Sequence, residues 1–297
     1  MVKTIEETYC DKDLYTHIID LPDSYIGSIE RAEADCWICE GDKIVSKSIQ
    51  YIPGLYKIYD EIIVNAYDQY TRLSLMKNVK DPVTMIKVNI DRENNTISVY
   101  NNGEGIPVDI HKKTKMYVPE MIFGVLLTSS NYSKDEKKLT GGKNGFGSKL
   151  TNIFSTEFII ETVDAERKKK YIQKFSKNML KKNKPTITKC STKPYTKITF
   201  KPDLSKFNLE ELEQDIVGLM ERRVYDIAAC TGKSVSVYLN EKKIDCKSLD
   251  KYVNYFFDEN VKKVYAVNNN TDRWEVCVVV NPQVRFEQMS FVNGIHT

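Results

Sequence analysis

The chain has 297 residues, of which 41% are hydrophobic, and 44 basic residues oppose 41 acidic ones for a net charge of +3. This length and apolar content predict one large or two moderate domains with a proper core and exclude a low-complexity or disordered chain. No apolar run is long enough to span a membrane and the N-terminus carries no secretory signal, so we expect an intracellular protein without membrane contact.

The first strong pattern is an amphipathic helix expected from Pro53 to about Ser74, with Pro53-Gly54 as its start signal. Glu61, Asn65 and Asp68 lie at i, i+4 and i+7 and form a polar stripe beside the apolar one. A carboxylate one turn from a carboxamide can take a proton from an attacking water and complete the shell of a phosphate-bound magnesium ion. A solvated polar face is the alternative interpretation.

A hairpin is expected next, from strands at Met85 to Asp91 and at Thr96 to Tyr100. The motif Asn101-x-Gly103-x-Gly105 then places a side-chain amide at a strand end, where it can pair with the edge of a base. The two glycines would let the backbone pass close to a flat ligand. An ordinary Asn-Gly turn is the alternative.

The strongest pattern is the glycine-rich run from Gly141 to Lys149, which leads into an apolar helix start at 150–154. Backbone amides at such a helix N-terminus converge on an anion, so this run predicts a phosphate cradle. The order Gly147-Ser148-Lys149 fits neither a P-loop nor a dinucleotide fingerprint. A flexible linker is the alternative, and the preceding polar segment at 129–141 is expected to be a mobile lid.

Further along, a long helix is expected from Asn208 to about Cys230, closing a first domain of residues 1–235. Alternating segments at 235–239, 261–267 and 274–280 then predict a second α+β unit, residues 236–297, which is incomplete. The first domain is expected to be a mixed, mostly antiparallel sheet covered on one face by helices.

Between Ala165 and Lys201 many basic residues face one acid, Glu166. This segment is either a nucleic-acid surface directed at phosphates or a sheet edge protected by lysines, and we favour the second interpretation. The seven cysteines include one close pair, Cys36-x-x-Cys39, without further ligands at zinc spacing, so all are expected to be reduced thiols.

Several blocks of the chain together resemble one family. The sequence is similar to the ATPase region of eukaryotic-type type IIA DNA topoisomerases, within the GHKL family of gyrase B subunits, MutL proteins, ninety-kilodalton heat-shock chaperones and sensor histidine kinases. This resemblance implies the α+β Bergerat ATP-binding fold followed by the beginning of a transducer domain. The blocks that carry it are 22–28, 116–120, 126–132, 141–149, 152–155, 222–228 and 290–295.

The resemblance also implies roles for single residues. Glu61 would be the general base, Asn65 the magnesium ligand and Asn101 the adenine contact, with Thr196 a weaker candidate for the same pocket. Tyr9 would lie on a strap that reaches the partner subunit's nucleotide. The ribose and phosphate contacts would be Ser129, Ser130, Asn131, Gly142, Lys143, Asn144, Gly145, Phe146, Gly147, Ser148 and Lys149. Gln69, Ser148 and Phe146 depart mildly from the residues usual at these positions.

The function implied is that of an ATP- and Mg²⁺-dependent gate in a type II DNA topoisomerase, a homodimer that passes one DNA duplex through another. Its location would be the nucleus, or a cytoplasmic replication site for a viral protein. The family's transducer lysine would lie beyond Thr297, in the remainder of the polypeptide, so this piece is expected to bind ATP and hydrolyse it poorly. The alternative is a nucleotide-gated dimerisation or DNA-binding module without efficient hydrolysis, against which the presence of Glu61 argues.

Overall fold

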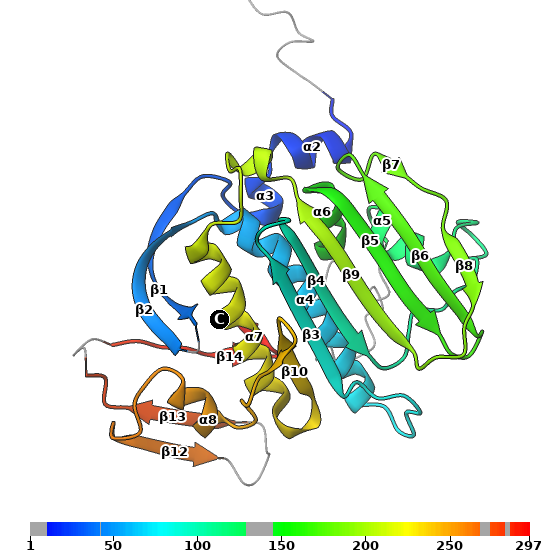
Figure 1. Ribbon diagram of the computed structural model, residues 1–297. Coiled ribbons are helices and arrows are strands. Elements are labelled where there is room, and N and C mark those ends of the chain that lie inside the picture. Colours follow the sequence, from blue (N-terminus) through cyan, green and yellow to red (C-terminus); the bar gives the residue numbers. More distant parts are fainter. Residues whose placement is uncertain (1–10, 42, 129–144, 268–273, 283–285) are drawn as a thin grey trace, which may run out of the picture.

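The computed structural model describes residues 11–41, 43–128, 145–267, 274–282 and 286–297. Its main sheet has nine strands in the order β11-β10-β3-β4-β9-β5-β6-β7, with β8 paired to β6 (Figure 1). Only β10 with β3 is a parallel pair among these strands, and the others are antiparallel. The strands are β3 (Met85–Asp91), β4 (Thr96–Asn102), β5 (Ser155–Asp164), β6 (Lys169–Ser176), β7 (Lys181–Lys182), β8 (Thr186–Lys189), β9 (Tyr195–Pro202), β10 (Ser236–Leu239) and β11 (Lys242–Lys243). The expected mixed, mostly antiparallel sheet is confirmed.

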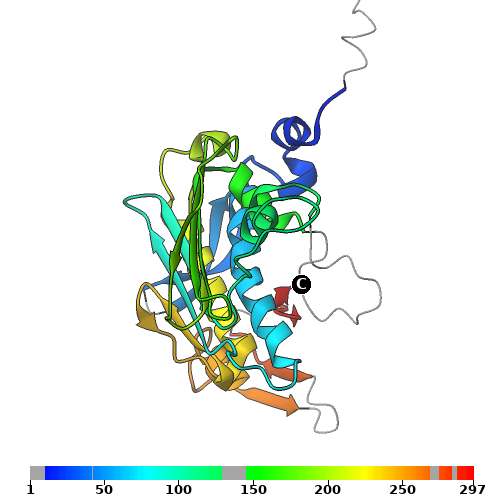
Figure 2. The same ribbon diagram turned by 90° about the vertical axis from the view of Figure 1, so that its right-hand side faces the viewer.

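One face of this sheet is covered by α4 (Pro53–Ser74), α5 (Val118–Gly124) and α6 (Gly147–Ile153), and Figure 2 shows the two layers edge-on. Period-2 alternation puts Ile86 and Val88 of β3 into the core between the layers, because successive side chains of a strand point to opposite faces. The predicted helix from residue 53 is confirmed as α4, with proline at its first position. Two short helices, α2 (Leu14–Asp20) and α3 (Asp23–Ile26), precede these elements.

A further layer forms where the hairpin of β1 (Ala32–Glu40) and β2 (Lys43–Tyr51) packs on α7 (Gln214–Thr231), as Figure 1 shows. Gly218 permits this approach, since a Cβ there would lie 2.6 Å from the carbonyl oxygen of Cys39. The hairpin was not anticipated from the sequence.

The predicted start of the α7 helix, Asn208, is wrong. A short 3₁₀ helix, η1 (Leu204–Phe207), ends at Asn208, whose φ of 53° is left-handed. The backbone of Leu212 is then held from outside: its N–H donates to Asn95 Oδ1 at 2.9 Å and its carbonyl accepts from Arg92 Nε at 2.9 Å. These bonds keep the segment before Gln214 out of the helix.

The boundary expected at residue 235 does not coincide with the limit of the main sheet, because β10 pairs with β3 and β11 extends that pairing. After η2 (Gly232–Ser234) and these strands come α8 (Leu249–Asn254), β12 (Lys263–Val267), β13 (Glu275–Val279), β14 (Phe291–Val292) and β15 (Ile295–His296). β12 and β13 form the two later alternating segments predicted from the sequence.

Most of the basic segment lies at one edge of the sheet, in β6, β7 and β8, while its last part is β9 in the middle of the sheet. Lys170 pairs with Glu161 at 3.0 Å, and Lys174 pairs with Glu157 on the open sheet face. The lysines of the outer strands β7 and β8 are exposed, as an edge protected by lysine predicts.

Across the described ranges, no helix combines the length and apolar character needed to cross a membrane. The six cysteines described there are free thiols.

Candidate active site

The first and third sequence motifs meet where α4 passes α6. Glu61 lies in the middle of α4, and its side chain is 23% exposed. A Cβ at Gly147 would lie 1.8 Å from Glu61 Oε2, so the carboxylate lies directly against the first residue of α6. Glycine at this position leaves the carboxylate its space, because a side chain there would force the end of the Glu61 side chain to move.

Lys57, one turn earlier on α4, pairs with Glu61 with Nζ 2.6 Å from Oε1. Burial acts to lower the pKa of Lys57, but the charge and hydrogen bond of Glu61 outweigh it, and the pKa is raised overall. The lysine therefore stays protonated and orients the carboxylate. The sequence analysis missed Lys57, although a Lys-Glu pair at i, i+4 on a helix is a recognisable signal.

Asn65 lies one turn beyond Glu61 on the same stripe, with an exposed side chain. The next turn ties α4 to the loop after β4, because Gln69 Nε2 donates to the carbonyl oxygen of Glu104 at 3.1 Å. Arg72 adds an ion pair to the Glu104 carboxylate at 3.3 Å. Two of the three sequence motifs are thus held together by side chains of α4.

Asn101 ends a row of polar residues on the helix-covered face of the sheet. Its side chain is buried, and it lies opposite Thr196 in the register of β4 and β9. Thr196 in turn lies opposite Thr162 of β5, with their hydroxyl oxygens 3.2 Å apart. The structure therefore brings the two adenine candidates side by side and adds Thr162, which no local pattern indicated because only strand register places it there.

The two glycines of the second motif were expected to let the backbone pass close to a flat ligand, and in the structure both pack closely against other parts of the chain. A Cβ at Gly103, whose φ is +105°, would lie 2.7 Å from Val83 Cγ2, and one at Gly105 would lie 1.8 Å from the carbonyl oxygen of Val163. These glycines let the loop pack on the protein itself, at the end of β5. The adjacent Asn102 accepts hydrogen bonds from the N–H groups of Thr84 and Met85 at 2.9 and 2.8 Å, which is a structural role.

Lys149 of α6 is 2% exposed, and its Nζ donates to the carbonyl oxygens of Thr128 at 2.6 Å and Gly145 at 2.5 Å. Burial lowers its pKa to about 8. Its ammonium group is therefore held by one backbone carbonyl inside the glycine-rich run, that of Gly145, and by one that precedes the run, that of Thr128.

Further contacts hold α6 and the residue before it in place. The Thr151 hydroxyl donates to the carbonyl oxygen of Ile58 at 2.8 Å and locks α6 to α4. Phe146 lies against the ring of Tyr25, with centroids 6.4 Å apart, and Ser148 is buried. The other proposed contacts lie outside the described residues: Tyr9, Ser129, Ser130, Asn131, Gly142, Lys143 and Asn144.

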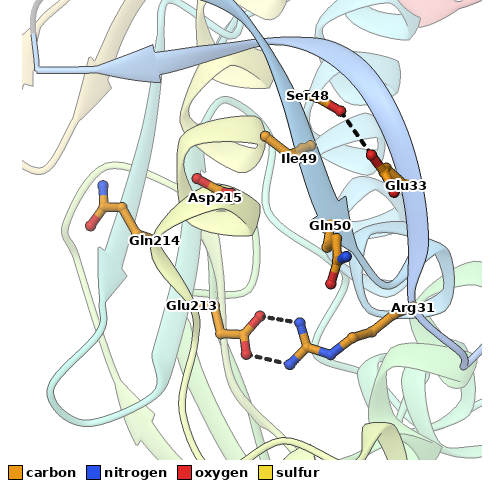
Figure 3. Close-up of a pocket in the computed structure, with 8 residues that line it drawn as sticks. All are labelled: Arg31, Glu33, Ser48, Ile49, Gln50, Glu213, Gln214 and Asp215. Carbon is orange, nitrogen blue, oxygen red and sulfur yellow. Dashed lines mark hydrogen bonds and ion pairs between the residues drawn. The ribbon is translucent and has the colours of Figure 1, made fainter.

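A cavity of about 530 Å³ lies away from these motifs, between the β1–β2 hairpin and the start of α7 (Figure 3). Arg31 and Glu213 in its lining pair with each other, since both terminal nitrogens of Arg31 donate to the Glu213 carboxylate at 2.8 and 2.5 Å, and Asp215 pairs with Lys47 at 2.9 Å. Figure 3 shows Arg31 and Glu213 facing each other, joined by these two hydrogen bonds. The candidate site is therefore the one formed by α4 and α6.

Residues 51–206 match the family described as histidine kinase-, DNA gyrase B-, and HSP90-like ATPase. The chain belongs to this family of ATPases.

Within the family, the chain is an ATPase region of the topoisomerase II type. It matches the ATPase region of Saccharomyces cerevisiae topoisomerase II with a TM-score of 0.90 and 45% identity, over 98% of this chain and 75% of that one. It is 53% identical to DNA topoisomerase 2 of Arabidopsis thaliana and 47% identical to that of Acanthamoeba polyphaga mimivirus, each over 99% of this chain. The chain spans 20% and 23% of the lengths of these two relatives. The 43K ATPase domain of Thermus thermophilus gyrase B shares the fold, with a TM-score of 0.56 at 16% identity.

Proposed function

We propose that this chain binds ATP with Mg²⁺ between α4, α6 and the end of β4, and that Glu61 is the general base for its hydrolysis. The observation that carries the proposal is the contact between the Glu61 carboxylate and Gly147. It puts a base, half-shielded from solvent, beside the first free N–H groups of α6, where phosphate binding is favoured.

The residues around this contact suit the parts of the nucleotide. The row of Asn101, Thr196 and Thr162, in which Asn101 and Thr162 are buried and Thr196 is half-buried, offers an amide and hydroxyls to the edge of an adenine. Asn65 offers one amide oxygen, which suffices for a magnesium ion that keeps its waters and the phosphate oxygens as its other ligands. Lys149 would lose its hydrogen bond to one of the two carbonyl oxygens and bring its positive charge to the phosphates.

In the reaction, the oxygen of a water forms a bond to the γ-phosphorus while the bond from that phosphorus to the bridging oxygen of ADP breaks. Glu61 accepts the proton of the water as the new oxygen–phosphorus bond forms. Lys57 holds the carboxylate in one orientation before the nucleotide is bound. The bound Mg²⁺ would neutralise charge that develops on the phosphate oxygens.

For the whole protein we propose the activity that its relatives' names state, that of DNA topoisomerase 2, with double-stranded DNA as substrate and ATP-gated homodimers as the working form. Its site of action would be the nucleus, or a cytoplasmic replication site if the protein is viral.

We place the start of the transducer after β11, from about residue 248 onward, because β10 and β11 complete the ATPase sheet. The alternative, a nucleotide-gated binding module, predicts no need for Glu61.

The test is Glu61→Ala in the full-length polypeptide, with ATP affinity and steady-state turnover measured separately. We expect turnover to fall by about 100-fold or more, which is the usual contribution of a general base, while ATP still binds. Glu241→Ala, which removes an exposed carboxylate on the open sheet face, is the control and should leave both quantities unchanged. Unchanged turnover in the Glu61 variant would overturn the enzymatic proposal and favour the binding module.

A further inference from the structure

The block of α7 that contains Arg222, Arg223 and Asp226 forms a buried ionic network that the nucleotide site does not use. Arg223 is 1% exposed and Asp226 is fully buried. Buried charges are costly unless their partners are well placed, and replacing such a network with apolar residues is often neutral for stability. Its contacts therefore call for an explanation beyond stability.

Arg223 joins three elements through one guanidinium group. Its Nε donates to Asp60 Oδ1 on α4 at 2.7 Å, and its Nη2 donates to the carbonyl oxygen of Gly294 at 2.7 Å. Its Nη1 has no hydrogen-bond partner and lies 3.9 Å from Asp226 Oδ2. Because the guanidinium is a rigid planar fork, these bonds fix the position of α4 relative to the turn that contains Gly294.

Gly294 lies in the two-residue turn of the β14–β15 hairpin. Asn293 and Gly294 both have positive φ, 52° and 73°, as a type I′ turn requires. A Cβ at Gly294 would lie 2.3 Å from the Tyr67 ring, so the turn also presses directly on α4. The hairpin thus touches the nucleotide helix at two points, through Tyr67 and through Arg223 with Asp60.

The far side of the hairpin is linked back to the same network. Phe291 lies against Tyr252 of α8, with ring centroids 6.1 Å apart. The Tyr252 hydroxyl donates to Asp226 Oδ1 at 2.6 Å, and Asp226 Oδ2 accepts from Arg222 Nη2 at 3.0 Å. Arg222 therefore stabilises α7 and α8, whereas among the hydrogen bonds and ion pairs of the described residues only that of Arg223 with Asp60 joins one of the two arginines to α4.

We infer that Arg223 is a positioning residue that couples the β14–β15 hairpin to α4, and so sets the placement of Glu61, the neighbour of Asp60. Displacement of the hairpin would be transmitted through the guanidinium to the helix that carries the base. This inference rests on the proposed role of Glu61.

The test compares Arg223→Met and the milder Asp60→Asn with Arg222→Met, a matched control on the same helix. Hydrogen–deuterium exchange of α4 and of residues 291–296 is measured on this chain, together with ATP affinity. In the full-length polypeptide, the single-turnover rate at saturating ATP is measured as well. We expect both Arg223→Met and Asp60→Asn to raise exchange in α4 and the hairpin together, and to slow turnover by about tenfold at unchanged ATP affinity.

Arg222→Met should leave exchange in α4 unchanged even if it lowers the melting temperature. Equal changes in α4 for Arg222→Met and Arg223→Met, or exchange raised in the hairpin alone, would overturn the inference. If Glu61→Ala leaves turnover intact, the proposed function fails, while the exchange data still decide whether Arg223 couples the two segments.

Discussion

At the scale of single residues, Lys149 makes the sharpest prediction, because it is a buried amine with a pKa of about 8 against an ordinary 10.5. Between these values the unfolded chain binds a proton that the folded chain has released. The free energy of unfolding should therefore rise with pH in this window, by up to about 1.4 kcal/mol per pH unit. Denaturant titrations of the wild type and of Lys149→Met between pH 7 and 10.5 measure this rise.

The difference in unfolding free energy, wild type minus Lys149→Met, should be flat below pH 8 and increase above it. A neutral amine keeps two N–H groups, enough for the carbonyl oxygens of Thr128 and Gly145. A difference that stays constant up to pH 10 would show that the amine remains protonated in the folded chain.

At the scale of elements, the contact of α4 with α6 is tested by Gly147→Ala. The new methyl group would meet the far end of the Glu61 side chain, which can move, so we expect a loss of stability below about 1 kcal/mol. The displaced carboxylate should nevertheless slow ATP hydrolysis by about 100-fold, since misplacement of about 1 Å has such effects. Thermal melting and single-turnover kinetics of the full-length variant give the two quantities.

Gly124→Ala is the matched control, because its methyl group would lie 2.5 Å from the ring of Phe175 in the core, away from Glu61. It should lose stability, by about 1–3 kcal/mol, without a comparable loss of rate in the molecules that remain folded. A Gly147→Ala protein with wild-type kinetics would mean that Glu61 acts from another position.

Elements with a strong local period were predictable from the sequence, and contacts across long sequence distances were not. α4 and the presence of a helix after the glycine-rich run follow from apolar spacing and a glycine run that are visible locally, although α6 begins at Gly147, before the expected start at residue 150. Thr162 joins the site only through the register of β5 with β9, and the start of α7 is set by Asn95 and Arg92, which lie far earlier in the chain. The contact of Gly105 with the carbonyl oxygen of Val163 was likewise not predictable, because the two residues are far apart in the sequence.

At the scale of the whole molecule, the N-terminal helix α3 contacts the residue before α6, through the rings of Tyr25 and Phe146. Tyr15 of α2 is tied to the sheet by a hydrogen bond from its hydroxyl to the carbonyl oxygen of Asn178 at 2.6 Å. A nucleotide bound at α6, as proposed above, would therefore act on the same surface that α3 contacts. This arrangement suits a chain whose dimerisation depends on ATP.

The claim that nucleotide binding drives dimerisation is tested most directly by sedimentation velocity of the 297-residue chain, with and without magnesium and a non-hydrolysable ATP analogue. We predict monomers without nucleotide and dimers with it, because ligand binding to the closed form stabilises that form by mass action. A sedimentation coefficient unchanged by saturating nucleotide would contradict gating by this chain, and failure to bind the analogue at all would contradict the ATP site at α4 and α6.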